Sequence, residues 1–456
     1  MLRKVMKSTI LGAALTMSLG AVSAPAETLA DALVGAYNSS GLLDQQRALL
    51  RVADEDVAQS VASLRPIIAW SYATRYSSPQ SFQQDSIQST IALTAEWVLW
   101  DAGRRQFGVA AQKELVLATR QALIDAEQNV LLRAVEAYMA VRGDVEILAL
   151  AQNNVRVITQ QLRAAQDRFE VGEVTRTDVA QAEARLASSR AELTVARGRL
   201  AISREEYRAV VGRFPGNLVA LNRLPEPVES EDEARAIALQ GHPSLRQAQI
   251  EVRASDLNVS AARASLQPTL SAQGSANWND DLDGDESLTL NFGGPIYRGG
   301  ELSSLIRQAQ QRSVASRANV HIVADRIRQG VGNAYARLRT AAANKVAVSQ
   351  QIQAAQIAFE GVSEEATLGA RTTLDVLNAE QELLDGRASF VTAETEEAIA
   401  AYAVLASMGL LTTDYLNLDV QVYDPTAYYN AVQNAPTFTS RQGRQLDKVL
   451  RALNKD

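Results

Sequence analysis

The sequence contains the same helical turn twice, and this internal repeat restricts the possible folds more than any other feature. The first copy reads Arg168-Phe-Glu-Val-Gly-Glu-Val-Thr-Arg-Thr-Asp-Val179, and the second reads Glu365-Ala-Thr-Leu-Gly-Ala-Arg-Thr-Thr-Leu-Asp-Val376. Gly172 corresponds to Gly369 and Asp178 to Asp375, an offset of 197 positions (375 less 178). A glycine that ends one helix, followed by Thr and Asp that open the next, is typical of a tight turn between antiparallel helices. We therefore predict a tandem duplication.

The helices beside each turn carry apolar and small residues at alternating spacings of three and four. After the first turn this seam contains Val179, Ala182, Leu186, Ser189, Leu193, Ala196, Leu200, Ser203, Tyr207 and Val210. The corresponding seam of the second copy contains Val376, Ala379, Leu383, Gly386, Phe390, Ala393, Glu397, Ala400, Val404 and Ser407, in which only Glu397 interrupts the pattern. A sustained repeat of 3.5 residues is typical of coiled coils. Amphipathic helices of a soluble bundle are the alternative explanation.

The amino terminus has the features of a secretory signal peptide. Basic residues within the first seven positions precede an apolar run from about Ser8 to Ala21, and small residues follow up to Ala26. We therefore assign residues 1–26 to a signal peptide and expect the mature chain to begin near Glu27. A transmembrane anchor is excluded because the apolar run is too short to cross a bilayer. Since the sequence contains no cysteine, an exported chain of this kind is held together by packing and carries no cysteine-linked lipid.

Composition and charge exclude some classes of partner and fold. The net charge is -7 and the pI is about 5.3, which argues against nucleic acid as a partner. Aromatic residues make up only 5% of the chain, which suits long solvated helices better than a large globular core. A chain of 456 residues could form several ordinary domains, but the regular helical repeat predicts one elongated molecule.

A helix is predicted at the start of each repeat, before the strands. The first spans about Thr28 to Leu64 and the second about Glu231 to Leu266, and a proline ends each because proline disfavours helical geometry in its predecessor. Polar interruptions lie near the start of both helices, around Asn38 and Gln240.

Beyond each proline the apolar pattern changes from a period of 3.5 to a period of two, which predicts four strands. The apolar face of the first pair comprises Ile68, Trp70, Tyr72, Tyr76, Ile87, Ile91, Leu93, Ala95 and Trp97, and that of the second pair comprises Leu270, Ala272, Ala276, Trp278, Leu288, Leu290 and Phe292. Polar residues such as Thr90 and Thr289 occupy the opposite face. Strands of about ten residues with these two faces fit a transmembrane barrel wall, with lipid outside and water inside. A small soluble sheet packed by its apolar face is the alternative.

The strand pairs, at 67–98 and 269–297, each contain a polar loop (77–85 and 279–285) and each end in a similar glycine-containing corner. All four tryptophans, Trp70, Trp97, Trp100 and Trp278, lie in or beside the strands, and we predict that they form an interfacial aromatic belt. Four strands cannot close a barrel, whose minimum is about eight, and open sheet edges are not tolerated in lipid. The barrel is therefore predicted to be shared between chains and surrounded by membrane lipid.

Helix lengths define the expected architecture. The helix from about Arg104 to Phe169 would be roughly 100 Å long at 1.5 Å per residue, and the shorter helices beside it would match it when laid end to end. We therefore divide the chain into a first repeat (27–211), a connector (212–230), a second repeat (231–411) and a C-terminal segment (412–456), with the tip turns at 170–176 and 367–373. The connector and the C-terminal segment are expected to surround the middle of the wall.

The Val171-Gly-Glu-Val-Thr-Arg-Thr-Asp-Val179 tip, the Asp101-Ala-Gly-Arg104 and Tyr297-Arg-Gly-Gly300 corners and the duplication together resemble the TolC family of outer-membrane efflux and type I secretion ducts. The resemblance covers nearly all of the mature chain. It implies a mainly α fold in which a homotrimer forms a periplasmic α-barrel and a shared twelve-stranded β-barrel in the outer membrane. It also implies docking to an inner-membrane transporter through a periplasmic adaptor. The lack of cysteine separates the chain from the lipidated branch of that family.

The resemblance also assigns roles to residues at the two tips. Asp375 corresponds to the acidic residue that rings the periplasmic aperture, whereas Asn378 stands where relatives carry a second aspartate. The residues expected to contact the adaptor are Val171, Gly172, Glu173, Leu368, Gly369 and Ala370.

In relatives, a set of bonded residues, called the lock below, holds the entrance closed, and this chain contains only part of that set. Arg371 corresponds to an arginine that bonds a neighbouring Thr-Asp pair, here Thr177 and Asp178. Ala366 replaces the tyrosine of that lock, which is expected to weaken it. Helix N-capping by Asp178 and Asp375 is an alternative role that is compatible with gating.

Two other classes of protein compete with a duct. A periplasmic adaptor also carries a long helical hairpin, but it has one hairpin flanked by compact β-domains, whereas this chain has two hairpins that alternate with strand pairs. An enzyme is disfavoured because the sequence contains no nucleophile-base constellation, phosphate loop or metal spacing, and we expect no cofactor and no metal. His242 and His321 lack metal-ligand spacing and are interpreted as helix-cap or surface residues.

Overall fold

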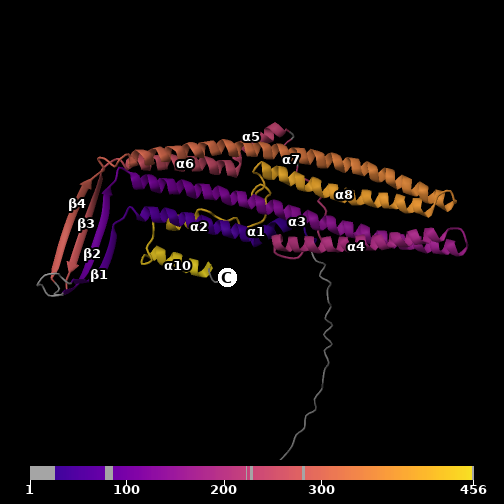
Figure 1. Ribbon diagram of the computed structural model, residues 1–456, viewed down its shortest axis with the longest axis horizontal. Helices are drawn as coiled ribbons and strands as arrows, with labels where there is room; N and C mark the ends of the chain where they lie inside the picture. Colours follow the sequence, from indigo (N-terminus) through magenta and orange to yellow (C-terminus); the bar gives the residue numbers. More distant parts are fainter. Residues whose placement is uncertain are drawn as a thin grey trace, which may run out of the picture.

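The computed structural model describes residues 26–77, 86–221, 223–225, 228, 230–279 and 283–453. The predicted signal peptide, apart from its last residue, lies outside the described residues, and so do 78–85 and 280–282 of the inter-strand loops. The described chain is long and narrow, with a sheet at one end and two helical tips at the other (Figure 1).

Two long helical hairpins form most of the molecule. The first consists of α3 (Arg104–Glu170) and α4 (Arg176–Val211), and the second of α7 (Glu301–Thr367) and α8 (Thr373–Ser407). The helices α3 and α7 contain 67 residues each, and are therefore roughly 100 Å long. Glu397, which interrupts the apolar seam of α8, pairs with Lys345 of α7 at 2.6 Å, so its charge is compensated where the two helices pack.

The prediction of one continuous helix before each strand pair is wrong, because each consists of two helices. In the first repeat α1 (Leu29–Ser39) and α2 (Gly41–Ala62) meet at Ser40, whose hydroxyl accepts a hydrogen bond from the Leu43 N–H. In the second repeat α5 (Glu231–Gly241) and α6 (Pro243–Ala264) meet at His242. A side chain that caps the second helix satisfies a backbone donor that the break leaves unpaired.

The two histidines take the roles that the sequence predicted. His242 Nδ1 accepts a hydrogen bond from the Ser244 N–H at 3.2 Å, and the helix α6 then begins with Pro243. Burial lowers the pKa of His242, and the nearby Asp125 only partly opposes this effect. His321 is exposed on α7.

The four strands form one antiparallel sheet in the order β1-β2-β3-β4. The strands are β1 (Ile67–Ser77), β2 (Ser86–Trp100), β3 (Thr269–Trp278) and β4 (Gly284–Gly293). The second strand of the first repeat pairs with the first strand of the second repeat, so the duplication produces one continuous sheet. Neither β1 nor β4 has a second neighbour among the described strands, and both remain open edges.

The register places the predicted apolar residues on one face of this sheet. Trp70 lies opposite Leu93, which lies opposite Ala276, and Leu270 lies opposite Phe292. Because side chains alternate between faces along a strand, residues directly opposite each other share a face. The other face carries polar side chains such as those of Ser275 and Ser287, whose hydroxyls are 2.9 Å apart. On the apolar face of the described strands, the only charged residue is Glu286 near the loop end of β4.

The corner between β2 and α3 is held by one aspartate and one arginine. Asp101 accepts hydrogen bonds from the Gly103 N–H and the Arg105 N–H, and it pairs with Arg105 Nε at 2.8 Å. Arg105 also donates to the carbonyl oxygens of Ser63 and Val98. Gly103 has a φ of 82°, a left-handed conformation that explains the glycine at this corner. These bonds fix the strand end against the helix that follows.

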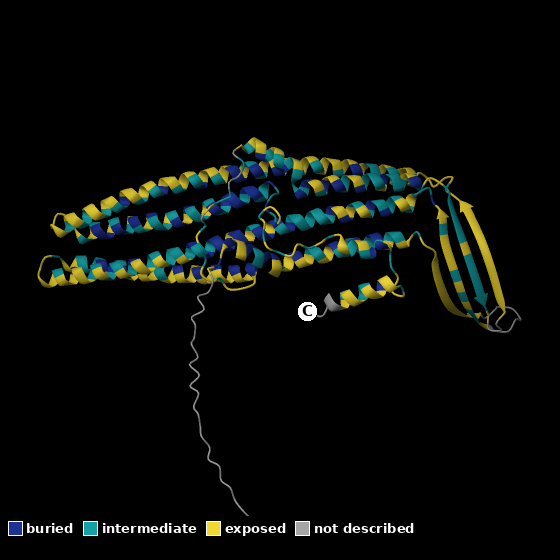
Figure 2. Ribbon diagram, turned by 180° about the vertical axis from the view of Figure 1, so that it is seen from behind, coloured by how far each residue is buried: buried dark blue, intermediate teal, exposed yellow. Residues whose placement is uncertain are grey.

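The main buried core lies at the middle of the molecule, where α1, α3 and α4 pack together and the connector crosses them (Figure 2). Glu27 is 7% exposed and its carboxylate accepts hydrogen bonds from Tyr207, Arg213 and the Gly216 N–H. Burial alone would raise the pKa of Glu27, but these hydrogen bonds outweigh burial and lower it. Tyr138 donates to the carbonyl oxygen of Val219, which attaches the connector to α3.

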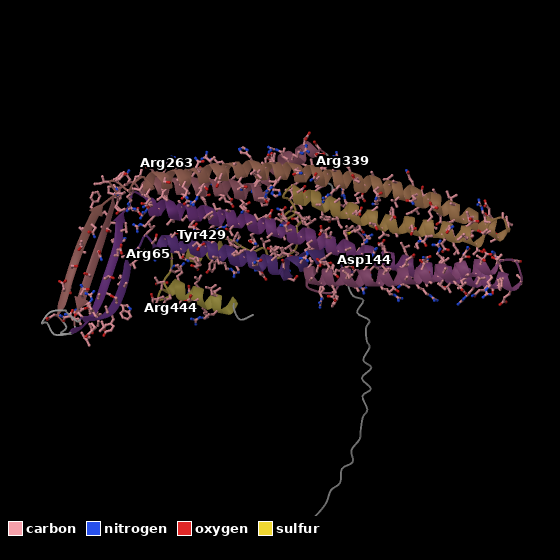
Figure 3. All side chains as sticks on the ribbon, viewed as in Figure 1. Arg65, Asp144, Arg263, Arg339, Tyr429 and Arg444 are labelled. Atoms are coloured by element: carbon pink, nitrogen blue, oxygen red, sulfur yellow. The ribbon has the colours of Figure 1, made fainter. Side chains whose placement is uncertain are left out.

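The C-terminal segment leaves the middle of the molecule and follows α2, so it extends beyond the region predicted for it. It contains α9 (Ala427–Val432) and α10 (Arg441–Leu453). Tyr428 donates to Glu55 of α2 at 2.7 Å, and Arg65 donates to the carbonyl oxygens of Asn434 and Ala435 close to the start of β1 (Figure 3). The segment therefore covers α2 as far as the sheet end of the helical part.

Candidate functional site: the hairpin tips

Each tip is a short turn whose glycine has a left-handed conformation. Gly172 has a φ of 79° and Gly369 a φ of 77°, and no atom would meet a Cβ at either position within 4 Å. The residue after each glycine closes the turn, because the Glu173 N–H donates to the Arg168 carbonyl and the Ala370 N–H to the Glu365 carbonyl. Glycine is needed here for its backbone conformation rather than for close packing.

Both aspartates of the tips belong to capping boxes. Asp178 accepts hydrogen bonds from the backbone and the hydroxyl of Thr175, and Asp375 accepts the same pair from Thr372. These bonds lower the pKa of both carboxyl groups. The capping threonines are Thr175 and Thr372, and the Thr-x-x-Asp pattern that identifies them is visible in the sequence. Both capping bonds of Asp375 reach the same oxygen, and the lowered pKa keeps the carboxylate charged at neutral pH.

Within one chain, Arg371 lies beside its own tip. Its Nε pairs with Glu365 at 2.7 Å, and Glu365 raises the pKa of the Arg371 guanidinium. The predicted partners Thr177 and Asp178 lie on the other hairpin and are not among the recorded partners of Arg371 in the described part of the chain. Ala366 is half-buried in the last turn of α7.

The two hairpins are joined near the tips by a polar and an apolar contact. Arg185 of α4 donates to Asn378 of α8 at 2.9 Å. Leu377 packs into a small cluster with Ile158, Ala182 and Leu186 of the first hairpin. The sequence alone did not indicate Arg185, because it lies outside the repeated turn and its role depends on how the hairpins meet.

The predicted adaptor-contact residues form the exposed ends of the two turns. Val171 is 72% exposed and Leu368 is 82% exposed, so each tip presents one apolar side chain to solvent. Gly172, Glu173, Gly369 and Ala370 are exposed beside them. Their contact with an adaptor stays a prediction.

The tryptophans lie at different levels of the sheet. Trp97 and Trp100 are in the part of β2 closest to the helices, and the Trp97 indole N–H donates to the Leu64 carbonyl at 3.1 Å. Trp278 is the last residue of β3, at the opposite end, and Trp70 is 77% exposed near the start of β1. Whether a belt forms depends on how several chains assemble, so the aromatic belt stays a prediction.

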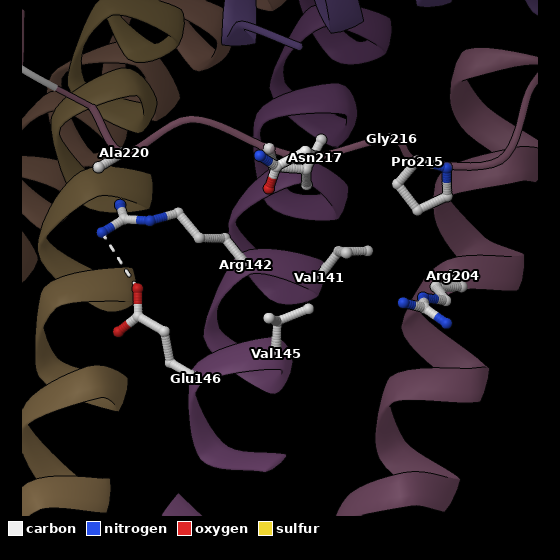
Figure 4. Close-up of a pocket in the computed structure, with 10 residues that line it drawn as sticks. Val141, Arg142, Val145, Glu146, Arg204, Pro215, Gly216, Asn217 and Ala220 are labelled. Atoms are coloured by element: carbon white, nitrogen blue, oxygen red, sulfur yellow. Dashed lines mark ion pairs between the residues drawn. The ribbon is translucent and has the colours of Figure 1, made fainter. Parts of the chain in front are cut away.

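A separate pocket lies at the middle of the molecule, between α3, α4 and the connector (Figure 4). Arg142 extends into it and contacts Glu146 at 3.4 Å, while Pro215, Gly216 and Asn217 of the connector form another wall. The residues that line this pocket include no histidine, serine or cysteine. Among the described residues, no group of three or more His, Asp and Glu side chains is arranged to hold a metal ion.

No helix in the described ranges is both long enough and apolar enough to cross a membrane.

A single sheet with two open edges, joined to helical hairpins roughly 100 Å long, is the architecture that the sequence predicted for an outer-membrane duct. The sequence model of the Outer membrane efflux protein family matches residues 34–213 and 235–410, which are the two repeats. The chain therefore belongs to the outer membrane efflux protein family. As a member it is an outer-membrane protein, and the resemblance to TolC is confirmed.

Individual relatives agree with this assignment. The outer membrane efflux protein BepC of Brucella suis is 36% identical over 420 residues, covering 90% of this chain and 92% of the relative. The outer membrane protein TolC of Escherichia coli is 24% identical over 385 residues, covering 78% of this chain and 76% of the relative. A crystal structure of CusC matches the fold with a TM-score of 0.75 at 18% identity, covering 83% of this chain and 91% of that chain.

Proposed function

We propose that the chain forms a homotrimeric outer-membrane channel for efflux or type I secretion, with the tips as its periplasmic entrance. The observation that carries this proposal is the sheet with two open edges and one continuous apolar face. Three copies would supply twelve strands, enough to close a barrel whose edges all find partners. The polar face would then line a water-filled lumen.

The exposed tips support a further part of the proposal, namely that they dock a periplasmic adaptor and, through it, an inner-membrane transporter. Val171 and Leu368 directly follow α3 and α7, and the turns there lie at the end of the molecule farthest from the sheet, where a periplasmic partner would meet the channel (Figure 1). The family matched by this chain consists of channel proteins, and we propose that the chain has no catalytic role and requires no cofactor.

We also propose that Asp375 forms the acidic ring of the entrance. Its carboxylate stays charged at neutral pH because the hydrogen bonds from Thr372 lower its pKa. Threefold symmetry would bring three such groups together, and closely spaced carboxylates bind multivalent cations. Arg371 and its partner Glu365 would lie beside this ring, where Arg371 could reach the Asp178 of a neighbouring hairpin when the entrance is closed.

Single-channel recording in planar bilayers tests both the channel and the ring. The purified protein should conduct ions, and a trivalent cation such as hexamminecobalt should block the current from the tip side. Asp375→Ala should weaken this block at least about tenfold, because each ring would lose three charges. A preparation that inserts but never conducts would contradict the channel.

Asp31→Ala is the matched control for this experiment, because Asp31 makes the same capping bonds with Thr28 at the start of α1, away from the tips. Each substitution removes a capping box, at a cost of about 0.5–2 kcal/mol to its helix. Only the substitution at Asp375 should change the block. Equal block in both variants and the wild type would mean that Asp375 only caps α8 and that the constriction lies elsewhere.

A further inference from the structure

Glu380 is a buried carboxyl group on α8, five residues beyond Asp375. The residue is 8% exposed, and its Oε2 atom has no hydrogen-bond partner in the described part of the chain. Its counterpart in the first repeat is Glu183 (380 less 197), which is exposed on α4. Because a buried polar group without a partner is costly, the burial of only one of these two glutamates requires an explanation.

The position of Glu380 is a junction between the two hairpins. It lies one helical turn after Leu377, which packs against Ile158 of α3 and Ala182 of α4. It also lies between Val376 and Leu383 of the seam that faces α7. The second hairpin packs against α3 and α4 mainly through α8. Separation of the two hairpins would therefore open one side of the Glu380 environment to water.

The charged groups at this level of the neighbouring helices have other partners. Arg185 of α4 binds Asn378, and Arg156 of α3 binds Asn153. On α7, Glu360 accepts a hydrogen bond from Gln356. Glu183 of α4 points to solvent. None of them contributes to the shift of the Glu380 pKa, which burial alone causes.

We propose that Glu380 is a proton-sensitive gating residue: it is protonated and buried while the α7-α8 hairpin lies against α3 and α4, and it ionises when the hairpins separate. This inference deepens the proposed function and depends on it, since it assigns a regulatory group to the proposed entrance. Glu380 acts by its charge at the hairpin junction and does not line the aperture itself.

The direction of the pH effect follows from the two environments of the carboxyl group. Burial raises the pKa of Glu380 from 4.5 to about 7 in the closed arrangement. Exposure to water would return the pKa toward its ordinary value, so the separated arrangement binds the proton less tightly. Rising pH therefore favours opening, and the ratio of open to closed channels should increase about tenfold per chain between pH 6 and pH 8. Asp375 stays ionised throughout this range because its pKa is lowered.

The test is a pH titration of the resting open probability in planar bilayers, with the full trimer and both chambers at the same pH. The wild type should open more as the pH rises from 6 to 8. Glu380→Gln, which resembles the protonated acid, should remove this dependence and should open less than the wild type at every pH from 6 to 8, because the amide stays neutral in both arrangements. Glu183→Gln provides the matched control at the corresponding exposed position and should titrate as the wild type does.

Each outcome has a definite meaning. A wild-type open probability that does not change between pH 6 and 8 overturns the inference without any variant, and so does a titration that survives in Glu380→Gln. If Glu380→Gln fails to assemble, a wild-type open probability that stays constant between pH 6 and 8 would still overturn the inference. A wild type that forms no channel would instead refute the proposed function, so the two failures are distinguishable.

Discussion

Asp54 on α2 is a fully buried carboxylate beneath the C-terminal segment. It lies between Leu50 and Val57 of an apolar cluster that Tyr423 and Tyr429 help to cover, and neither of its oxygens has a hydrogen-bond partner among the described residues. Burial raises its pKa from 3.8 to about 6, although the charge of Arg120 partly opposes the shift. The C-terminal segment therefore covers an acid that resists ionisation.

This burial predicts a pH-dependent effect of Asp54→Asn. Since the pKa is higher in the folded state than in the unfolded state, the stability present below pH 3.8 is lost as the pH rises from 3.8 to about 6, and it stays lost above that range. The amide should raise the free energy of unfolding by about 1–3 kcal/mol at pH 8, and by much less at pH 4.5. Thermal unfolding in detergent measures both values.

Asp56→Asn on the same helix is the control for this prediction and should produce no gain that depends on pH. A stabilisation of the same size at pH 4.5 and pH 8 would show that Asp54 does not titrate on unfolding. A loss of stability at pH 8 would show that the charge pairs with Arg120 more strongly than burial disfavours it.

The sequence predicted residue roles only where the interacting residues are a few positions apart in the chain. The glycine and aspartate of each tip follow from spacing alone, because a turn and a capping box are formed by residues a few positions apart. The burial of Glu380 could not be predicted, since Glu183 occupies the same place in the repeat and is exposed. Glu380 is buried and Glu183 is exposed because of how the helices pack, and a local sequence pattern does not predict helix packing.

At the scale of elements, the sheet faces provide a direct test of where lipid contacts the chain. Arginine at Leu93 or Leu290, on the apolar face, should cost roughly 2–4 kcal/mol near the middle of the bilayer and should reduce the assembled protein in outer-membrane fractions. Arginine at Thr90 or Thr289, on the polar face, should be tolerated because it would contact water. Quantitative blotting of membrane fractions compares the four variants.

The comparison of the four arginine variants tests whether the two faces of the sheet contact lipid and water respectively. Equal losses from both sets would show that the two faces are not divided between lipid and water. Equal tolerance would show that the sheet does not cross a membrane at all, which would favour the soluble sheet considered from the sequence.

The sequence predicted most of the helices and strands because their apolar residues repeat with different periods. The change from a 3.5-residue to a two-residue repeat locates the strands between the helices, and the register confirms the predicted apolar face. The breaks at Ser40 and His242 were visible only as polar interruptions. Their effect was not predicted, because a short polar stretch can continue a helix or end it, and side-chain capping decides which.

At the scale of the whole molecule, the two open edges of the sheet mean that a single chain cannot satisfy all of its strand backbone groups by itself. The exposed side chains of β4 include Leu288 and Phe292, at 78% and 70%, and those of β1 include Trp70. Water would leave this apolar face exposed, and lipid would leave the unpaired backbone groups of both edges unsatisfied. Association with other copies, as in the proposed trimer, would remove both costs.

Native mass determination of the protein extracted from outer membranes in mild detergent tests the proposed trimer most directly. We expect one species of three chains, each lacking the signal peptide, and loss of that species when Leu290→Arg is introduced on the apolar face of β4. A soluble periplasmic monomer, or a detergent-extracted species with a number of chains other than three, would contradict the account.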